Sequence, residues 1–220
     1  MRILHQQDMK YDLVIFDFDG TIADTSEGII DAHIFTLKSM NRVIPCNEDL
    51  QGLIGKSLLD IYLKVFDFSE TEAKEAISIY RGRYSKIGIY KFNLYDEICD
   101  TIENLKKRDI KIGIASLKAE SFIVEMLEDM HIHELFDYVC GIDENDYLNK
   151  TEILRKCLFL SGVDIERTIF VGDSKDDYIG ASNAGVNFLG VTYGFGFNRA
   201  EEYSFPMVNS PYEIGKHILI

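Results

Sequence analysis

The sequence lacks the features that mark several common classes of protein. No apolar run approaches the roughly 20 residues that a membrane-spanning helix needs, and the amino-terminal MRILHQQDMK holds no apolar signal-peptide core. The four cysteines are widely separated and form no C-x-x-C pair, so neither a zinc site nor a redox motif is indicated. Only three prolines are present, and there is no Pro-rich linker. We therefore expect a cytoplasmic globular protein without a membrane partner.

Basic residues are scarce as well. The chain has 23 Lys and Arg against 37 Asp and Glu, which gives a formal net charge of -14. Nucleic-acid binding requires clustered Lys and Arg that replace phosphate counterions, so the composition argues against a nucleic-acid partner. If the protein binds an anion, the positive charge must be supplied locally, by a metal ion or by a few basic side chains.

The part of the chain beyond about residue 90 alternates short apolar runs with amphipathic helical patterns. This alternation is typical of a mostly parallel sheet with helices on both faces, a three-layer, Rossmann-like α/β core. The predicted strands are 110–116, 138–142, 168–174 and 187–194, and the predicted helices lie near 96–108, 118–129, 150–161 and 177–184.

Residues 24–88 have a different pattern. The segments 26–40 and 69–87 place apolar residues at helical spacing, with no strand between them. We interpret this region as a helical module inserted after the first strand. The predicted division is therefore an α/β core made of residues 1–23 and 89–220, and a small helical domain made of residues 24–88.

The stretch VIFDFDGTIADT ends an apolar, strand-like run in two acids, Asp17 and Asp19. Ser116 and Asp173 also stand where apolar runs stop, and ligands of open parallel sheets bind beyond the carboxyl ends of the strands. With Asp177 added, several carboxylates compete for one small volume, and each like-charged pair costs about 2 to 3 kcal/mol at an effective dielectric near 20. A hard cation such as Mg²⁺ removes this conflict.

The motifs DFDGT (17–21), Ser116, Lys150 and GDSKDD (172–177) occur in the order and rough spacing of the haloacid dehalogenase superfamily. The resemblance covers nearly the whole chain. It is strongest to the phosphoglycolate phosphatase-like and β-phosphoglucomutase-like branch, in which a helical cap domain follows the first motif. By this resemblance, residues 24–88 would be the cap.

The resemblance implies a Mg²⁺-dependent phosphatase that acts on a small phosphorylated metabolite through an aspartyl-phosphate intermediate. Asp17 would be the nucleophile, and Asp19 would be the general acid and base. Lys150 would also offset the charge that develops in the reaction. The groups expected to bind the phosphoryl oxygens are Gly20, Thr21, Ser116 and Lys150.

The same resemblance implies the metal ligands. Mg²⁺ would be held by the carboxylates of Asp17 and Asp173 together with the backbone carbonyl of Asp19. Asp177 would support this coordination, with Asp176 as the less favoured alternative.

Several residues separate the phosphatase from its alternatives. The fourth motif reads Gly172-Asp173, where β-phosphoglucomutases generally have Glu-Asp, and Lys56 stands near the position of their phosphate-gripping Arg. These differences favour hydrolysis over a phosphosugar mutase. Leu117 and Thr151 replace the Asn and Pro that usually follow the motif serine and lysine, which removes one polar contact and loosens one turn.

A receiver-type signalling domain would also carry a phosphorylatable Asp, but such domains are shorter and lack the helical insertion. Within the enzyme interpretation the substrate stays open among phosphoglycolate, a sugar phosphate, a nucleotide and pyrophosphate. Lys56, on the IGKS loop of the helical region, is the candidate for contacting the part of the substrate that is not transferred.

Overall fold

The computed structural model describes residues 10–143 and 148–219. The central sheet consists of β1 (Leu13–Phe16), β4 (Lys111–Ala119), β5 (Tyr138–Ile142), β6 (Thr168–Gly172), β7 (Asn187–Val191) and β8 (Met207–Val208). Its spatial order is β5-β4-β1-β6-β7-β8, and every neighbouring pair is parallel. The expected α/β fold with a mostly parallel sheet is confirmed.

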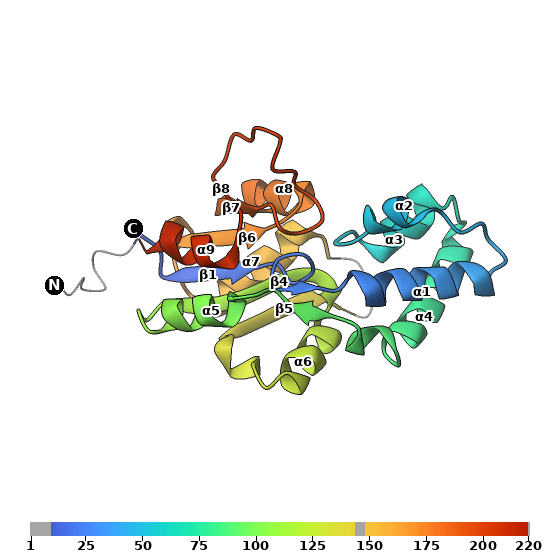
Figure 1. The fold of residues 1–220 in the computed structure, drawn as a ribbon, viewed down its shortest axis with the longest axis horizontal. Coiled ribbons are helices and arrows are strands. Elements are labelled where there is room, and N and C mark those ends of the chain that lie inside the picture. Colours follow the sequence, from blue (N-terminus) through green and yellow to red (C-terminus); the bar gives the residue numbers. More distant parts are fainter. Residues whose placement is uncertain (1–9, 144–147, 220) are drawn as a thin grey trace.

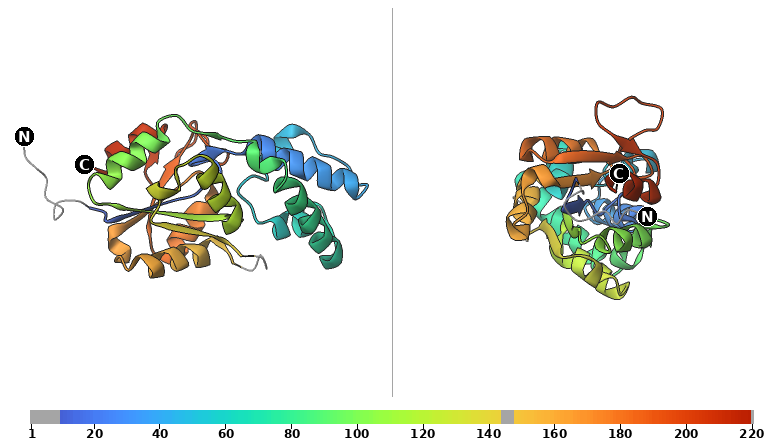
Figure 2. Two further views of the ribbon diagram at one scale, coloured as in Figure 1. Left: turned by 90° about the horizontal axis from the view of Figure 1, so that it is seen from below. Right: turned by 90° about the vertical axis from the view of Figure 1, so that its left-hand side faces the viewer.

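Helices cover both faces of this sheet (Figures 1 and 2). One face carries α5 (Ile98–Lys106), α6 (Glu120–Asp129) and α9 (Pro211–Ile218), and the other carries α7 (Lys150–Ser161) and α8 (Lys175–Ala184). Side chains of β1 alternate between the two cores: Val14 and Phe16 pack on the first side, Leu13 and Ile15 on the second. Burial on both faces explains why this strand is a continuous apolar run.

The structure corrects one predicted boundary that matters for function. We expected a strand over 110–116 with Ser116 at its end, whereas β4 continues to Ala119. Its pairing with β5 is regular up to Ala115 and resumes at Ala119, with an irregularity between them. Ser116 therefore lies inside an irregular strand rather than beyond it.

A group of helices lies between two very short strands, β2 (Ala23–Asp24) and β3 (Asn93–Leu94), which pair antiparallel. We call residues 25–92 the helical insert. It contains α1 (Ser26–Ser39), α2 (Asn47–Gln51), α3 (Leu58–Asp60), the π-helical turn Ile61–Val65, α4 (Glu70–Tyr84) and the 3₁₀ turn Gly88–Tyr90. Figure 1 shows the insert beyond one end of the sheet, on the side where the parallel strands finish.

None of the helices in the described part of the chain has the length and apolar character needed to cross a membrane. The longer helices of the insert, α1 and α4, pack on each other through buried residues that include Ala32 and Ala73. The start of α1 also touches the turn that leads back to the core. There, a methyl group on Gly28 would overlap the backbone carbonyl of Gly88, so this approach requires glycine.

We predict that Gly28→Ala destabilises the protein by about 1 to 3 kcal/mol, because the added methyl forces α1 away from the Gly88 turn. Gly82→Ala is the matched control: a methyl there meets no atom within 4 Å, and Gly82 lies in α4, where alanine favours the helix by about 0.5 to 1 kcal/mol. Urea denaturation of both variants measures the difference. Equal midpoints for the Gly28→Ala variant and the wild type would show that this contact yields without cost.

Candidate active site

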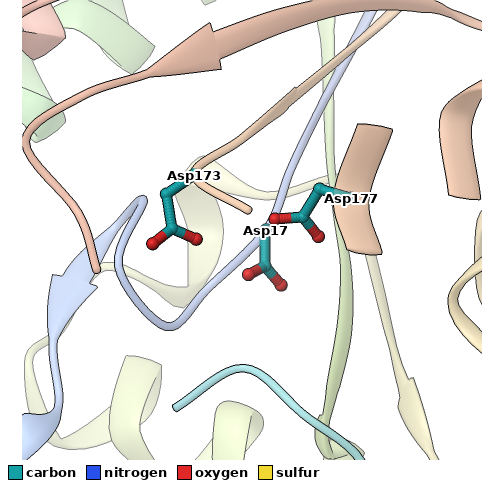
Figure 3. Close-up of side chains that lie close together, drawn as sticks. All are labelled: Asp17, Asp173 and Asp177. Atoms are coloured by element: carbon teal, nitrogen blue, oxygen red, sulfur yellow. The ribbon is translucent and has the colours of Figure 1, made fainter. Parts of the chain in front are cut away.

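Three acids gather at the carboxyl end of the central strand. Asp17 follows β1, Asp173 follows β6, and Asp177 lies in the first turn of α8. All three are buried, and each offers a carboxylate oxygen within 4.8 Å of the others (Figure 3). The sheet order explains the convergence, since β1 and β6 are neighbours and parallel strands end at the same edge.

The backbone around the cluster fixes two of these carboxylates. Asp173 Oδ2 accepts hydrogen bonds from the N–H groups of Phe195 (2.6 Å) and Gly196 (3.2 Å). Asp177 Oδ2 accepts from the N–H (3.1 Å) and hydroxyl (2.7 Å) of Ser174, which caps α8. Of the two acids expected to support the metal, Asp177 is buried in the cluster and Asp176 is exposed, and the metal role of Asp177 stays a prediction.

The turn after β1 depends on Gly20. Its φ is +84°, and a Cβ there would overlap the Asp173 carboxylate. The Gly20 N–H donates to the Ala23 carbonyl at 2.8 Å, and the Thr21 N–H donates to the Phe18 carbonyl at 3.4 Å. Thr21 is fully buried, and its hydroxyl has no hydrogen-bond partner among the described residues. Both residues shape the turn, and their phosphate contacts stay a prediction.

Lys150, at the start of α7, also reaches the cluster. Its Nζ lies 2.7 Å from Asp17 Oδ1 and 2.8 Å from Asp177 Oδ1, and its side chain is buried. Asn149 caps α7 and makes Lys150 the first helical residue. The stem crosses α8 at Gly180, where a Cβ would lie 2.6 Å from Lys150 Cγ. Lys150 therefore does not face solvent, although it opens a helix.

Sequence reasoning missed a second buried lysine, Lys118. Its Nζ lies 2.9 Å from Asp19 Oδ1 and 4.5 Å from the centre of the Tyr84 ring. The Thr25 hydroxyl donates to the same Asp19 oxygen at 2.6 Å. The available signal was spacing, because Lys118 stands two residues after Ser116 and strand residues at that spacing share a face. The Lys118 N–H also donates to the Ser116 hydroxyl at 3.4 Å.

The electrostatics of the site are dominated by burial. Burial raises the pKa of Asp17 to about 7, and Asp177 and Asp19 add to the rise while Lys150 opposes it. Burial, with Asp177 and Asp17, also raises the pKa of Asp173 well above its ordinary value. For Lys150 burial alone would lower the pKa, but the neighbouring Asp17 and Asp177 outweigh it and raise the pKa.

The buried charges of the site also do not balance. Four buried carboxylates, Asp17, Asp19, Asp173 and Asp177, face two buried ammonium groups, those of Lys118 and Lys150. Two negative charges are left without a counter-charge among these side chains, which is the charge of one divalent cation. Carboxylate oxygens are the ligands that Mg²⁺ prefers, so this donor set fits the ion.

A small cavity of about 50 Å³ lies between the helical insert and the sheet. Asp19 and Lys118 line it from the core side, and His33, Lys56 and Tyr84 line it from the insert. Lys56 is exposed and lies on the loop between α2 and α3. The structure therefore places the predicted nucleophile in the carboxylate cluster, and the predicted acid and Lys56 along the cavity.

The fold and the site define an α/β enzyme whose acidic centre, at the end of the first strand, lies beneath a helical insert. Residues 14–191 match the sequence model of the haloacid dehalogenase-like hydrolases, and the chain belongs to this family. The expected resemblance and the expected enzyme class, a phosphatase, are both confirmed.

Named relatives are similar over most of the chain. A 5'-nucleotidase of Pseudomonas aeruginosa is 31% identical over 189 residues, which is 86% of this chain and 86% of that protein. A pyrophosphatase, PpaX, of Bacillus cereus is 32% identical over 186 residues, 84% of this chain and 85% of that protein. A solved structure described as a predicted phosphatase from Clostridium acetobutylicum has a TM-score of 0.89 and 28% identity, covering 95% of this chain and 98% of that one.

We predict that Asp177→Asn weakens Mg²⁺ binding about 10- to 100-fold, since it removes one charge from the buried cluster and alters the contact to Lys150. Asp176→Asn is the matched control, because Asp176 is the exposed neighbour on the same helix turn. Titration calorimetry with MgCl₂, supported by the rise in Tm that Mg²⁺ causes, measures both variants. If both substitutions changed the affinity for Mg²⁺ equally, the cation would not be assigned to this cluster.

Proposed function

We propose that the protein is a Mg²⁺-dependent phosphatase that hydrolyses a small phosphate monoester through an aspartyl-phosphate on Asp17. The observation that carries the proposal is the different surroundings of the two acids of the first motif. Asp17 lies in the carboxylate cluster against Lys150, whereas Asp19 lines the cavity under the helical insert. A monoester bound across this boundary has its phosphorus beside Asp17 and its leaving group beside Asp19.

The reaction then follows in two steps. An Asp17 oxygen attacks phosphorus, the bond from phosphorus to the ester oxygen breaks, and Asp19 gives its proton to the departing alcohol. In the second step Asp19 takes a proton from water, which attacks the aspartyl-phosphate and releases inorganic phosphate. Lys118 and Thr25 both contact Asp19 Oδ1, so Oδ2 is the oxygen that exchanges the proton.

The remaining polar groups hold the phosphoryl group. The Ser116 hydroxyl and the Lys150 ammonium lie at the same end of the sheet as Asp17 and suit phosphoryl oxygens. The Mg²⁺ would be held by Asp17, the Asp19 carbonyl, Asp173 and Asp177, and when bound it supplies positive charge to the phosphoryl group. Lys150 orients Asp17 through its 2.7 Å contact.

The helical insert would act as a cap over this centre, with residues 1–23 and 89–220 as the core domain and 24–88 as the cap domain. The chain passes from the core to the insert through β2 and returns through β3, and each of these strands is two residues long. Closure of such a cap would exclude water from the first step, and its reopening would admit the water that the second step consumes. This arrangement favours turnover of a small substrate over the role of a signalling switch.

The identity of the substrate is tested by assaying phosphate release from a panel of phosphorylated metabolites with and without Mg²⁺. The panel should include a nucleotide, a sugar phosphate, phosphoglycolate and pyrophosphate. Loss of all activity in EDTA, restored by Mg²⁺, is the expected result. Turnover that persists without any divalent cation would refute the proposal.

We predict that Asp17→Asn lowers kcat by about 10³-fold or more, because an amide neither attacks phosphorus nor balances the cation. Beryllium fluoride, which mimics a phosphoryl group on a carboxylate, should inhibit the wild type. The same reagent should not bind the Asn variant, as measured by calorimetry. Asp176→Asn serves as the control for an acidic-to-amide change nearby, and should keep both activity and inhibition.

We predict that Lys56→Ala changes the relative kcat/KM of two substrates that differ only in their leaving groups, by an amount corresponding to about 1.5 to 3 kcal/mol. Lys150→Ala should instead lower kcat/KM for all substrates by the same factor, since Lys150 would contact the transferred phosphoryl group. Lys64→Ala is the control, because Lys64 is an exposed lysine of the insert whose partner is the surface residue Asp60. An unaltered ratio in Lys56→Ala would exclude Lys56 from substrate selection.

A further inference from the structure

Lys118 is a buried lysine to which the two reaction steps assign no atom of the substrate. It lies near the end of β4, in the stretch where the pairing with β5 is irregular. Its side chain is only 5% exposed, and its Nζ lies 2.9 Å from Asp19 Oδ1. A buried ammonium group is costly unless it is paired. The ion pair that the described residues provide for Lys118 is the one with Asp19.

The two buried lysines of the site lie beside different acids. Lys150 Nζ lies 2.7 Å from Asp17, the proposed nucleophile, within the carboxylate cluster. Lys118 instead lines the cavity under the helical insert together with Asp19, the proposed acid. In the proposed reaction this cavity receives the leaving group. The placement of Lys118 therefore ties it to the transfer of the proton and not to the attack on phosphorus.

Two donors from different parts of the chain fix one oxygen of Asp19. Lys118 donates to Oδ1 from the core at 2.9 Å, and the Thr25 hydroxyl donates to it from the start of the insert at 2.6 Å. The ring of Tyr84, also in the insert, lies with its centre 4.5 Å from the Lys118 ammonium, a favourable contact for a cation. Rotation of the Asp19 carboxyl group would break both hydrogen bonds, so these donors oppose it.

We propose that Lys118 is a positioning residue, whose ammonium group holds Asp19 so that the proton on Oδ2 meets the ester oxygen of the leaving alcohol. The inference rests on the proposed phosphatase function. As the bond from phosphorus to the ester oxygen breaks, this oxygen takes the proton from Oδ2, and Asp19 becomes a carboxylate. The hydrogen bond from Lys118 is stronger to the carboxylate than to the neutral acid, which favours the transfer. Lys118 acts through Asp19 and not on the phosphoryl group.

The experiment compares ethyl phosphate with acetyl phosphate, two substrates of similar size. Ethoxide is a strong base that must be protonated as it leaves, whereas acetate leaves as a stable anion. The value of kcat/KM isolates the first step, because the leaving group departs before water attacks the aspartyl-phosphate. Lys118→Met should lower kcat/KM for ethyl phosphate about 10- to 100-fold, the range of one hydrogen bond to a charged group, and keep that for acetyl phosphate within about twofold of the wild type.

Two further variants complete the comparison. Lys118→Gln, whose amide still donates to Asp19 but carries no charge, should keep part of the activity on ethyl phosphate. Lys111→Met is the matched control, because Lys111 begins the same strand and its Nζ donates to the Ser161 carbonyl at 3.0 Å. This control should leave both kcat/KM values unchanged. If the wild type hydrolyses ethyl phosphate too slowly to measure, the best alkyl ester of the metabolite panel replaces it.

Binding of beryllium fluoride reports whether the Asp17 centre is intact in each variant. An equal loss of kcat/KM on both substrates in Lys118→Met, or no loss on either, overturns the inference. Failure of both Lys118 variants to fold or to bind beryllium fluoride also overturns it, since Lys118 would then support the fold of the whole site. A wild type that hydrolyses neither these two substrates nor any ester of the panel with Mg²⁺ would instead refute the underlying phosphatase proposal.

Discussion

The burial of negative charge at the end of β1 governs how the rest of the molecule is built. Asp17, Asp173 and Asp177 would be strongly disfavoured in this position without compensation. The chain supplies part of it: Lys150 threads past α8 where Gly180 leaves space, and backbone N–H groups of a distant loop bind Asp173. Both features bring compensating groups to the buried acids.

The two buried lysines divide the positive charge between the two acids of the first motif. Lys150 contacts Asp17 from the start of α7, and Lys118 contacts Asp19 from the end of β4. The two acids of the first motif therefore contact different ammonium groups, although they are only two residues apart in sequence. Thr25, directly before α1, also binds Asp19, which links the acid to the first helix of the insert.

The sheet could be predicted because its strands are buried on both faces and read as continuous apolar runs. Asp17 and Asp173 could be placed for the same reason, since each directly follows such a run. Lys118 could not be placed in the site, because the sequence predicted that the strand ends at Ser116. In the structure this strand continues through an irregular stretch to Ala119. The backbone N–H groups that donate to Asp173 could not be predicted either, because almost every residue type carries a backbone N–H.

The contacts inside the insert were the hardest to predict from the sequence, and the reason is physical. An aromatic group such as Tyr62 and Tyr80 around His33 has the sequence pattern of an ordinary helical core, and only the three-dimensional contacts reveal a ring nitrogen without a partner. The strand ends of the core must keep a fixed geometry to neutralise the carboxylates. The insert takes part in this geometry, because the Thr25 hydroxyl donates to Asp19 and the Tyr84 ring lies against Lys118, so both parts of the chain shape the cavity between them.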